Sequence, residues 1–291
     1  ALQVELTPVY RGGTLKAADL VMQGEVEVAF NLGGGFHHAH SNQASGFCIF
    51  NDVAVCLAHI TSRYDVQRVA YLDIDAHHGD GVMYAFYESP SVLDIDFHES
   101  GAYLFPGTGR VDEIGSGEGS GFKVNIPLPP LTSDEAFMKA FDMLVPRLLR
   151  AYEPEVVLLQ SGIDAHYADR VAHLALTKRS YAHVARSVKQ LTEELCEGRV
   201  IVTGGGGYNT LNVARCWALE LAEFADARVS NLIPQEWSDL YLGLEGSTLT
   251  RLMWSDEEAE SQLRNPAVVR EVEGIVEEVK RLVFPRLNIQ G

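Results

Sequence analysis

The sequence predicts an α/β fold with an open, mostly parallel β-sheet and helices on both of its faces, giving three α/β/α layers. Apolar runs of strand length alternate along the chain with segments of helical periodicity, and no repeat period is present. The run that begins Val69-Ala70-Tyr71-Leu72 is typical of a strand buried on both faces of a parallel sheet. No strong linker divides the 291 residues, so residues 1–291 are expected to form one domain.

The first half of the chain has clear element boundaries. Asn51 is a suitable N-cap for a helix that reaches about Tyr64. Residues 100–121 are Gly-rich and irregular, and a loop of this length is often functional. The other expected elements are a helix at 14–24, a strand at 25–30, a strand from Val69, a helix near 81–87, and strands at 91–97 and 122–128.

The second half repeats the alternation of strand and helix. Residues 133–152 have helical periodicity, and Pro146 is expected to kink that helix. The tail beyond Trp237 is charged and expected to be mostly helical, with no cluster of site residues. The remaining expected elements are strands at 156–160 and 200–203 and helices at 178–196 and 209–224.

Composition excludes some function classes. The formal net charge of −17 argues against binding nucleic acid through a general basic surface. The four cysteines are scattered without paired spacing, so reduced core thiols are expected rather than a disulfide framework. No apolar run reaches membrane-spanning length and no signal peptide opens the chain, so a cytoplasmic protein without membrane contact is expected.

Side chains suited to catalysis follow four of the expected strands. They are His37-His38, Asp75-Ala76-His77, Asp164, and the Gly-rich segment that ends at Tyr208. Parallel strands all end at one edge of the sheet, and ligands bind at that edge in open α/β folds. The sequence therefore predicts that these four loops meet in one site.

Asp75, His77 and Asp164 are the candidate metal ligands. A buried ionised carboxylate is costly unless a positive charge lies beside it, and a metal ion supplies that charge. Two carboxylates and one imidazole leave room for water, as in catalytic metal sites. Zn²⁺ fits this set best, although ligand type alone also allows iron(II), cobalt or manganese. The alternative is a buried strand that ends in a solvated polar loop.

His37 and His38 are candidates for proton transfer, because a neutral imidazole can take up and return a proton near pH 7. Asp73 and Asp80 are not needed as ligands and could orient the two rings. A pair of loop histidines without a function is the alternative. The histidine pair follows three glycines at the end of a strand, and this position makes a pair without a function the weaker interpretation.

The Tyr208 hydroxyl could donate a hydrogen bond to a developing oxyanion. The four glycines before it could instead form only a tight turn between strand and helix, and a phosphate cradle is disfavoured because no complete phosphate-binding motif is present. Phe47 and Phe105 lie in expected loops and could line a narrow apolar slot for a long side chain, or simply pack against the protein.

Five ordered motifs resemble those of the zinc-dependent histone deacetylase superfamily. They are Gly-Gly-Phe-His-His-Ala at 34–39, Ala-Ser-Gly-Phe-Cys-Ile-Phe-Asn-Asp at 44–52, Asp-Ile-Asp-Ala-His-His-Gly-Asp-Gly at 73–81, Phe-Pro-Gly-Thr-Gly at 105–109 and Gly-Gly-Gly-Gly-Tyr-Asn at 204–209. Residues 98–104 resemble the bacterial acetoin-utilisation deacetylase branch, and the similarity runs from about Val9 to Trp217.

The resemblance implies an arginase–deacetylase α/β fold and hydrolysis of N-acetyl-lysine to lysine and acetate. It implies that Asp75, His77 and Asp164 bind zinc and that Tyr208 polarises the acetyl carbonyl. The other implied roles are the general base and acid for His38 paired with Asp80, electrostatic assistance for His37 paired with Asp73, and the walls of the lysine tunnel for Gly46, Phe47, Phe105 and Gly206.

Potassium is also implied by the resemblance. The first potassium site would involve Asp73, Asp75, His77, Asp96 and Phe97, and a second would fall at Phe86, Ser89, Val92 and Phe122. Asp96 departs from the family pattern, which has a small hydroxyl residue there. Family members also carry an N-terminal segment that is expected to be missing ahead of Ala1.

Three alternatives stay open. A ureohydrolase with two manganese ions shares Asp-Ala-His, but the loop Asp-Ala-His-Tyr-Ala-Asp at 164–169 lacks the Asp-x-Asp that a second metal requires. A catalytically impaired acyl-lysine-binding protein is the second alternative, against which His38 and Tyr208 count. Within deacetylases, an acetylated protein lysine is the favoured substrate, and a small acetylated amine of the acetylpolyamine type is the alternative.

Overall fold

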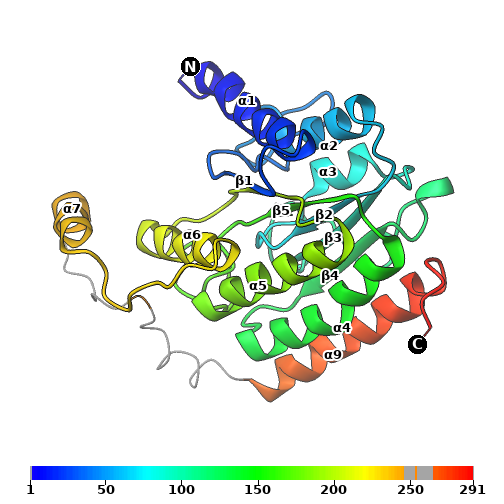
Figure 1. The fold of residues 1–291 in the computed structure, drawn as a ribbon. Helices are drawn as coiled ribbons and strands as arrows, with labels where there is room; N and C mark the ends of the chain where they lie inside the picture. Colours follow the sequence, from blue (N-terminus) through cyan, green and yellow to red (C-terminus); the bar gives the residue numbers. More distant parts are fainter. Residues whose placement is uncertain (1, 246–252, 254–264, 291) are drawn as a thin grey trace.

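A six-stranded sheet forms the middle layer of the protein (Figure 1). The computed structural model describes residues 2–245, 253 and 265–290. Over these residues the strand order is β1-β6-β5-β2-β3-β4, and all neighbouring strands run parallel. The strands are β1 (Val28–Asn31), β2 (Val69–Asp73), β3 (Val92–Glu99), β4 (Lys123–Leu128), β5 (Val156–Gln160) and β6 (Val200–Thr203).

Helices cover both faces of this sheet (Figure 1). One face carries α1 (Leu2–Met22), α2 (Asp52–Arg63) and α3 (Asp80–Ala85). The opposite face carries α4 (Asp134–Tyr152), α5 (Lys178–Leu195), α6 (Thr210–Phe224) and α9 (Pro266–Val283). The short helix η1 (Gly117–Gly119) interrupts the irregular loop, and α7 (Gln235–Glu245) follows α6. The expected three-layer α/β/α architecture is confirmed.

The side chains of strand β2 contribute to two hydrophobic cores, one on each face of the sheet. Alternate side chains of a strand point to opposite faces of the sheet. Val69 and Tyr71 accordingly pack with α1 and α2, whereas Ala70 and Leu72 pack with the helices of the other layer. All five residues of β2 are buried, as the apolar run predicted. The strand thus places Asp73, its last residue, in a region without solvent.

Two elements begin at least three residues away from their predicted first residue. Helix α1 begins at Leu2 rather than residue 14, and it continues through Gly12 and Gly13 although glycine is unfavourable in a helix interior. Strand β1 begins at Val28 rather than residue 25, because residues 25–27, two of which are glutamates, form the connection from α1. Helix α4 contains Pro146 and continues to Tyr152. Of the predicted helical tail, residues 246–252 and 254–264 lie outside the described residues.

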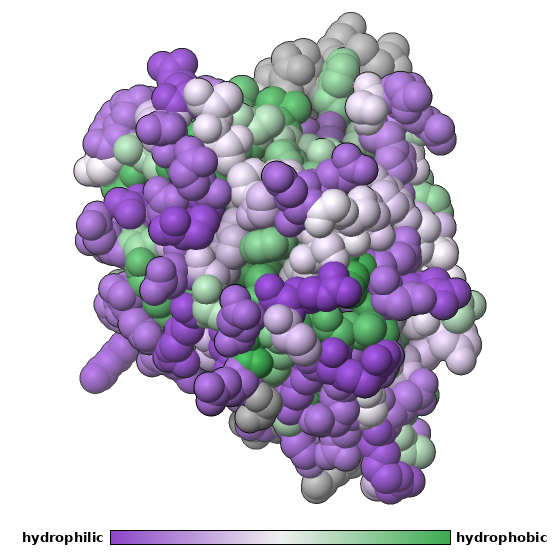
Figure 2. Space-filling model, turned by 90° about the vertical axis from the view of Figure 1, so that its right-hand side faces the viewer, coloured by the Kyte–Doolittle hydropathy of each residue, from purple (hydrophilic) through white to green (hydrophobic). Residues whose placement is uncertain are grey.

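The state of the cysteines and the character of the surface match what the composition predicted. All four cysteines are buried and free, as expected of reduced core thiols. Across the described ranges, no helix combines the length and the apolar character needed to cross a membrane. On the face shown in Figure 2, apolar residues form small patches among hydrophilic ones.

Candidate metal and proton-transfer site

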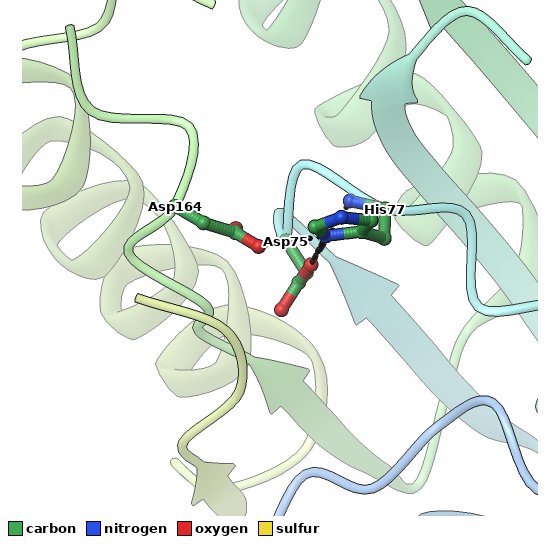
Figure 3. Close-up of side chains that lie close together, drawn as sticks. All are labelled: Asp75, His77 and Asp164. Atoms are coloured by element: carbon green, nitrogen blue, oxygen red, sulfur yellow. Dashed lines mark hydrogen bonds and ion pairs between the residues drawn. The ribbon is translucent and has the colours of Figure 1, made fainter. Parts of the chain in front are cut away.

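Three predicted ligands meet where β2 and β5 end. Asp75 and His77 lie in the loop after β2, and Asp164 lies in the loop after β5 (Figure 3). All three are buried, and one ligand atom from each lies within 4.8 Å of the others. His77 Nδ1 is 2.7 Å from Asp164 Oδ2 and 3.2 Å from Asp75 Oδ1. The three side chains therefore face one point from two neighbouring strands.

The electrostatics of these residues suit a cation. Burial raises the pKa of Asp164 to about 6, and the neighbouring Asp75 carboxylate adds to that rise. Burial acts in the same direction on Asp75, but His37 and His77 outweigh it and lower the pKa of Asp75. Burial lowers the pKa of His77, yet Asp164 and Asp75 dominate and raise it to about 11. A proton on His77 thus balances part of the charge that a divalent ion would neutralise.

Backbone groups fix the orientation of both carboxylates. Asp164 Oδ1 accepts a hydrogen bond from Ala76 N at 2.8 Å, and Asp75 Oδ2 accepts one from Gly206 N at 2.6 Å. A methyl group at Gly162 would lie 2.0 Å from Asp75 Oδ2, and one at Gly206 would lie 2.1 Å from Asp164 Oδ2. Both positions therefore require glycine. Gly206 was a predicted site residue, whereas Gly162 was missed although it stands two residues before Asp164.

The two predicted histidines form paired contacts beside the ligands. His37 Nδ1 lies 2.8 Å from Asp73 Oδ2, and His38 Nδ1 lies 2.8 Å from Asp80 Oδ1. The Nε2 atoms of the two rings are 3.2 Å apart, and His37 Nε2 is 3.9 Å from Asp75 Oδ1. The structure therefore brings together both His–Asp pairs that the sequence suggested.

His38 is suited to accept a proton. Burial and the neighbouring His37 lower its pKa to about 4, although Asp80 acts in the opposite direction. The His38 imidazole is therefore neutral at neutral pH, and its Nδ1 is engaged by Asp80. The other nitrogen, Nε2, has no carboxylate partner and lies 3.2 Å from His37 Nε2, so it is the candidate atom for proton transfer.

The loop that carries both histidines is held by the start of α2. Asp52 accepts hydrogen bonds from Gly35 N and from Phe36 N, the latter at 2.8 Å. Asn51 donates from Nδ2 to the carbonyls of His37 and Ala39, at 2.9 and 3.1 Å. Asn51 also caps α2 by accepting from Ala54 N, as predicted. The contacts to the histidine loop were missed, because they join segments that only the fold brings together.

Tyr208 lies half-buried in the loop after β6. Burial raises the pKa of its phenol, and the carboxylates of Asp164 and Asp75 add to the rise. The hydroxyl therefore keeps its proton and can act as a hydrogen-bond donor near the ligands. Asp169 Oδ2 accepts from Tyr208 N at 2.8 Å and ties this loop to the loop of Asp164. This contact of Asp169 was not predicted from the sequence.

Phe105 lies against His38, and Phe47 follows a glycine that packs on the same ring. The rings of His38 and Phe105 meet edge to face, with centroids 5.1 Å apart. Gly46 has a φ of +50°, and a methyl group there would lie 2.3 Å from Cδ2 of His38. The following residue, Phe47, is 78% exposed, and Phe105 is 48% exposed. Apolar surface is thus accessible to solvent directly beside the histidines.

The predicted inner potassium residues form an acidic cluster. Asp96 pairs in register with Asp73 across β2 and β3, and both are buried. Burial raises the pKa of Asp73 well above its usual value, and Asp96 and Asp75 add to the rise. Asp96 Oδ1 is 2.7 Å from His98 Nδ1, and Asp96 Oδ2 accepts from Gly79 N at 2.8 Å. Asp96, which stands where the family pattern has a small hydroxyl residue, therefore adds a buried carboxylate that has its own hydrogen-bond partners.

A buried acid lies beneath the loop of Asp164. Glu220 of α6 is fully buried, and its Oε1 accepts a hydrogen bond from the Ser161 hydroxyl at 2.6 Å. Within the described residues, Glu220 Oε2 has no hydrogen-bond partner. Burial raises the pKa of Glu220 to about 8. The folded protein therefore holds this proton more tightly than the unfolded chain does.

Glu220 is expected to make stability fall as pH rises from about 5 to 8, because the folded state binds more protons than the unfolded state in this range. The slope is about 1.4 kcal/mol per pH unit. Glu220→Gln removes this term, so urea unfolding at pH 6 and pH 8 should show a smaller loss of unfolding free energy than in the parent. Glu223→Gln, which changes a partly exposed acid of α6 that pairs with Arg186, is the control, and equal pH dependence of the two variants would contradict the assignment.

A family model described as the histone deacetylase domain matches residues 4–224. An acetoin utilization protein AcuC of Bacillus subtilis is 44% identical over 247 residues, covering 81% of this chain and 64% of the relative. AcuC of Staphylococcus aureus is 39% identical over 247 residues, covering 84% of this chain and 63% of the relative. The chain therefore spans less than two thirds of the length of these relatives.

Proposed function

This chain belongs to the histone deacetylase domain family, and from that membership we propose that it is a metal-dependent amidohydrolase that deacetylates N-acetyl-lysine. One observation carries the proposal: a buried Asp75–His77–Asp164 ligand set lies beside the neutral imidazole of His38. The products are acetate and the free lysine amine. Water supplies the oxygen of the new carboxylate and the proton that the amine takes up.

The metal ligands in this proposal are Asp75, His77 and Asp164. Two carboxylates and a neutral imidazole carry two negative charges, which a divalent ion balances. Zinc is the favoured ion and iron(II) is the alternative, because both accept oxygen and nitrogen ligands. When bound, the ion supplies a Lewis acid that polarises the acetyl carbonyl and lowers the pKa of water.

His38 takes the general base and acid roles. Its neutral Nε2 accepts a proton from the attacking water, and the Asp80 carboxylate stabilises the imidazolium that results. The same nitrogen then returns the proton to the leaving amine as the carbon–nitrogen bond breaks. His37, held by Asp73, lies between His38 and Asp75 and assists electrostatically.

Tyr208 donates its hydroxyl proton in a hydrogen bond to the acetyl oxygen as negative charge develops there. Its raised pKa keeps the donor protonated through the working pH range. Asp169 fixes the backbone of Tyr208, and thereby limits the directions in which the hydroxyl can point. A donor fixed in this way requires little reorganisation when the oxyanion forms.

The substrate proposed is an acetylated lysine of a protein. Its path is lined by Gly46, Phe47, Phe105 and Gly206. An acetyl-lysine side chain is uncharged, which suits the apolar surface beside His38.

A monovalent cation such as potassium is proposed among Asp73, Asp75, His77, Asp96 and Phe97. The raised pKa of Asp73 supports it, because buried neighbouring carboxylates require compensating charge.

The direct test measures metal content and acetate release together. The parent protein is expected to release acetate from an acetyl-lysine peptide, to lose this activity after dialysis against a chelator, and to regain it with zinc or iron(II). Acetylspermidine, assayed in parallel, separates the two substrate classes. Metal-replete protein that binds the peptide without releasing acetate would favour the acyl-lysine-binding alternative instead.

A further inference from the structure

Lys123, the first residue of β4, is a fully buried lysine whose ammonium group is enclosed by carbonyl oxygens. Its Nζ donates hydrogen bonds to the carbonyls of Val92 at 2.7 Å and of Ser89 and Phe122 at 3.2 Å. An ammonium group has three protons, and all three are used here. Ser89 lies in the segment before β3, Val92 is the first residue of β3, and Phe122 is the residue before β4.

All three carbonyl oxygens belong to residues that were expected to form the second potassium site. That set comprised Phe86, Ser89, Val92 and Phe122, and the carbonyl of Phe86 accepts instead from Ser89 N at 3.0 Å. Carbonyl oxygens coordinate potassium by replacing its water shell, and they accept hydrogen bonds from an ammonium group in a similar way. A potassium ion cannot contact these oxygens while the ammonium group lies among them.

A buried acid accompanies the buried lysine. Asp94 of β3 is the register partner of Lys123, is 2% exposed, and has no hydrogen bond to either carboxylate oxygen among the described residues. Burial raises the pKa of Asp94 well above its usual value, Asp96 adds to the rise, and Lys123 opposes it. Burial lowers the pKa of Lys123 to about 8, and Asp94 opposes that shift. The two residues therefore compensate each other across the strands.

We propose that the Lys123 ammonium group replaces the second monovalent cation of the fold, so that this chain exchanges potassium at one place at most. The positive charge at the amino ends of β3 and β4 is thus supplied by a side chain of the protein instead of by a bound ion. The proposed catalytic residues lie at the carboxyl ends of the strands, so the inference does not rest on the proposed deacetylase activity.

The experiment counts bound rubidium, a potassium analogue, by equilibrium dialysis of the metal-loaded protein at constant ionic strength. The parent is expected to bind at most one Rb⁺ per chain. Lys123→Ser removes the ammonium group from the three carbonyl oxygens and is expected to bind one Rb⁺ more than the parent. Its melting temperature should also rise further with KCl than with choline chloride, because ligand binding stabilises the folded state.

Lys139→Ser is the matched control, because Lys139 is an exposed lysine of α4 that pairs with Glu273. It should bind as many Rb⁺ ions as the parent. Equal counts for Lys123→Ser and the parent would overturn the proposal. Should Lys123→Ser fail to fold, the parent decides alone: two bound Rb⁺ ions overturn the proposal, and one or none supports it.

Discussion

Replacing Asp164 by asparagine is expected to abolish metal binding and acetate release together. Asparagine keeps the volume of the side chain, and its amide oxygen can still accept the hydrogen bond from Ala76 N. The carboxylate that faces His77 Nδ1 is lost, and with it half of the negative charge that holds a divalent ion. Since metal catalysis supplies several kcal/mol, the rate should fall by about a thousandfold or more.

Metal per chain by elemental analysis and acetate release from an acetyl-lysine peptide are the two readouts. Asp142→Asn is the control, because Asp142 is an exposed acid on α4 that contacts His183. This control should keep both metal and activity. Asp164→Asn protein that is folded, fully metal-loaded and active would show that Asp164 is not a ligand.

The fold and the convergence of the candidate metal ligands were predictable because each depends on local patterns and one topological rule. The apolar run before Asp73 indicated a strand buried on both faces, and the alternation of strands and helices indicated parallel pairing. Parallel strands end at one edge of the sheet, so Asp75 and Asp164 were expected to meet although they are far apart in the sequence. The hydrogen bond from Ala76 N to Asp164 joins residues whose numbers differ by 88. The structure confirms this convergence.

Other features could not be predicted, because they depend on packing between loops. Asp52 appeared to be part of a helix start, yet its carboxylate holds the histidine loop through two backbone amides. Gly162 carries no functional group, and its importance is visible only from the absence of space beside Asp75. Lys123 was unexpected in the core because lysine is almost never fully buried without partners, and its partners are backbone carbonyls.

Replacing Tyr208 by phenylalanine should leave the metal in place and remove most of the turnover. The phenyl ring preserves packing in the loop, and the backbone contact with Asp169 does not involve the hydroxyl. Loss of one donor to a developing oxyanion typically lowers kcat by about a hundredfold or more. Tyr241→Phe, in α7, is the control for removal of a tyrosine hydroxyl elsewhere.

The pH dependence of Tyr208→Phe separates a hydrogen-bond donor from a general base. Burial and nearby carboxylates raise the pKa of Tyr208, so the phenol is expected to stay protonated between pH 6 and pH 9. A donor that never titrates contributes equally across the profile, and kcat should fall by the same factor at pH 6 and pH 9. A general base would instead make the loss grow with pH. Full activity of Tyr208→Phe would remove this residue from the mechanism and leave stabilisation of the oxyanion to His37 and to the cation that Asp75, His77 and Asp164 would hold.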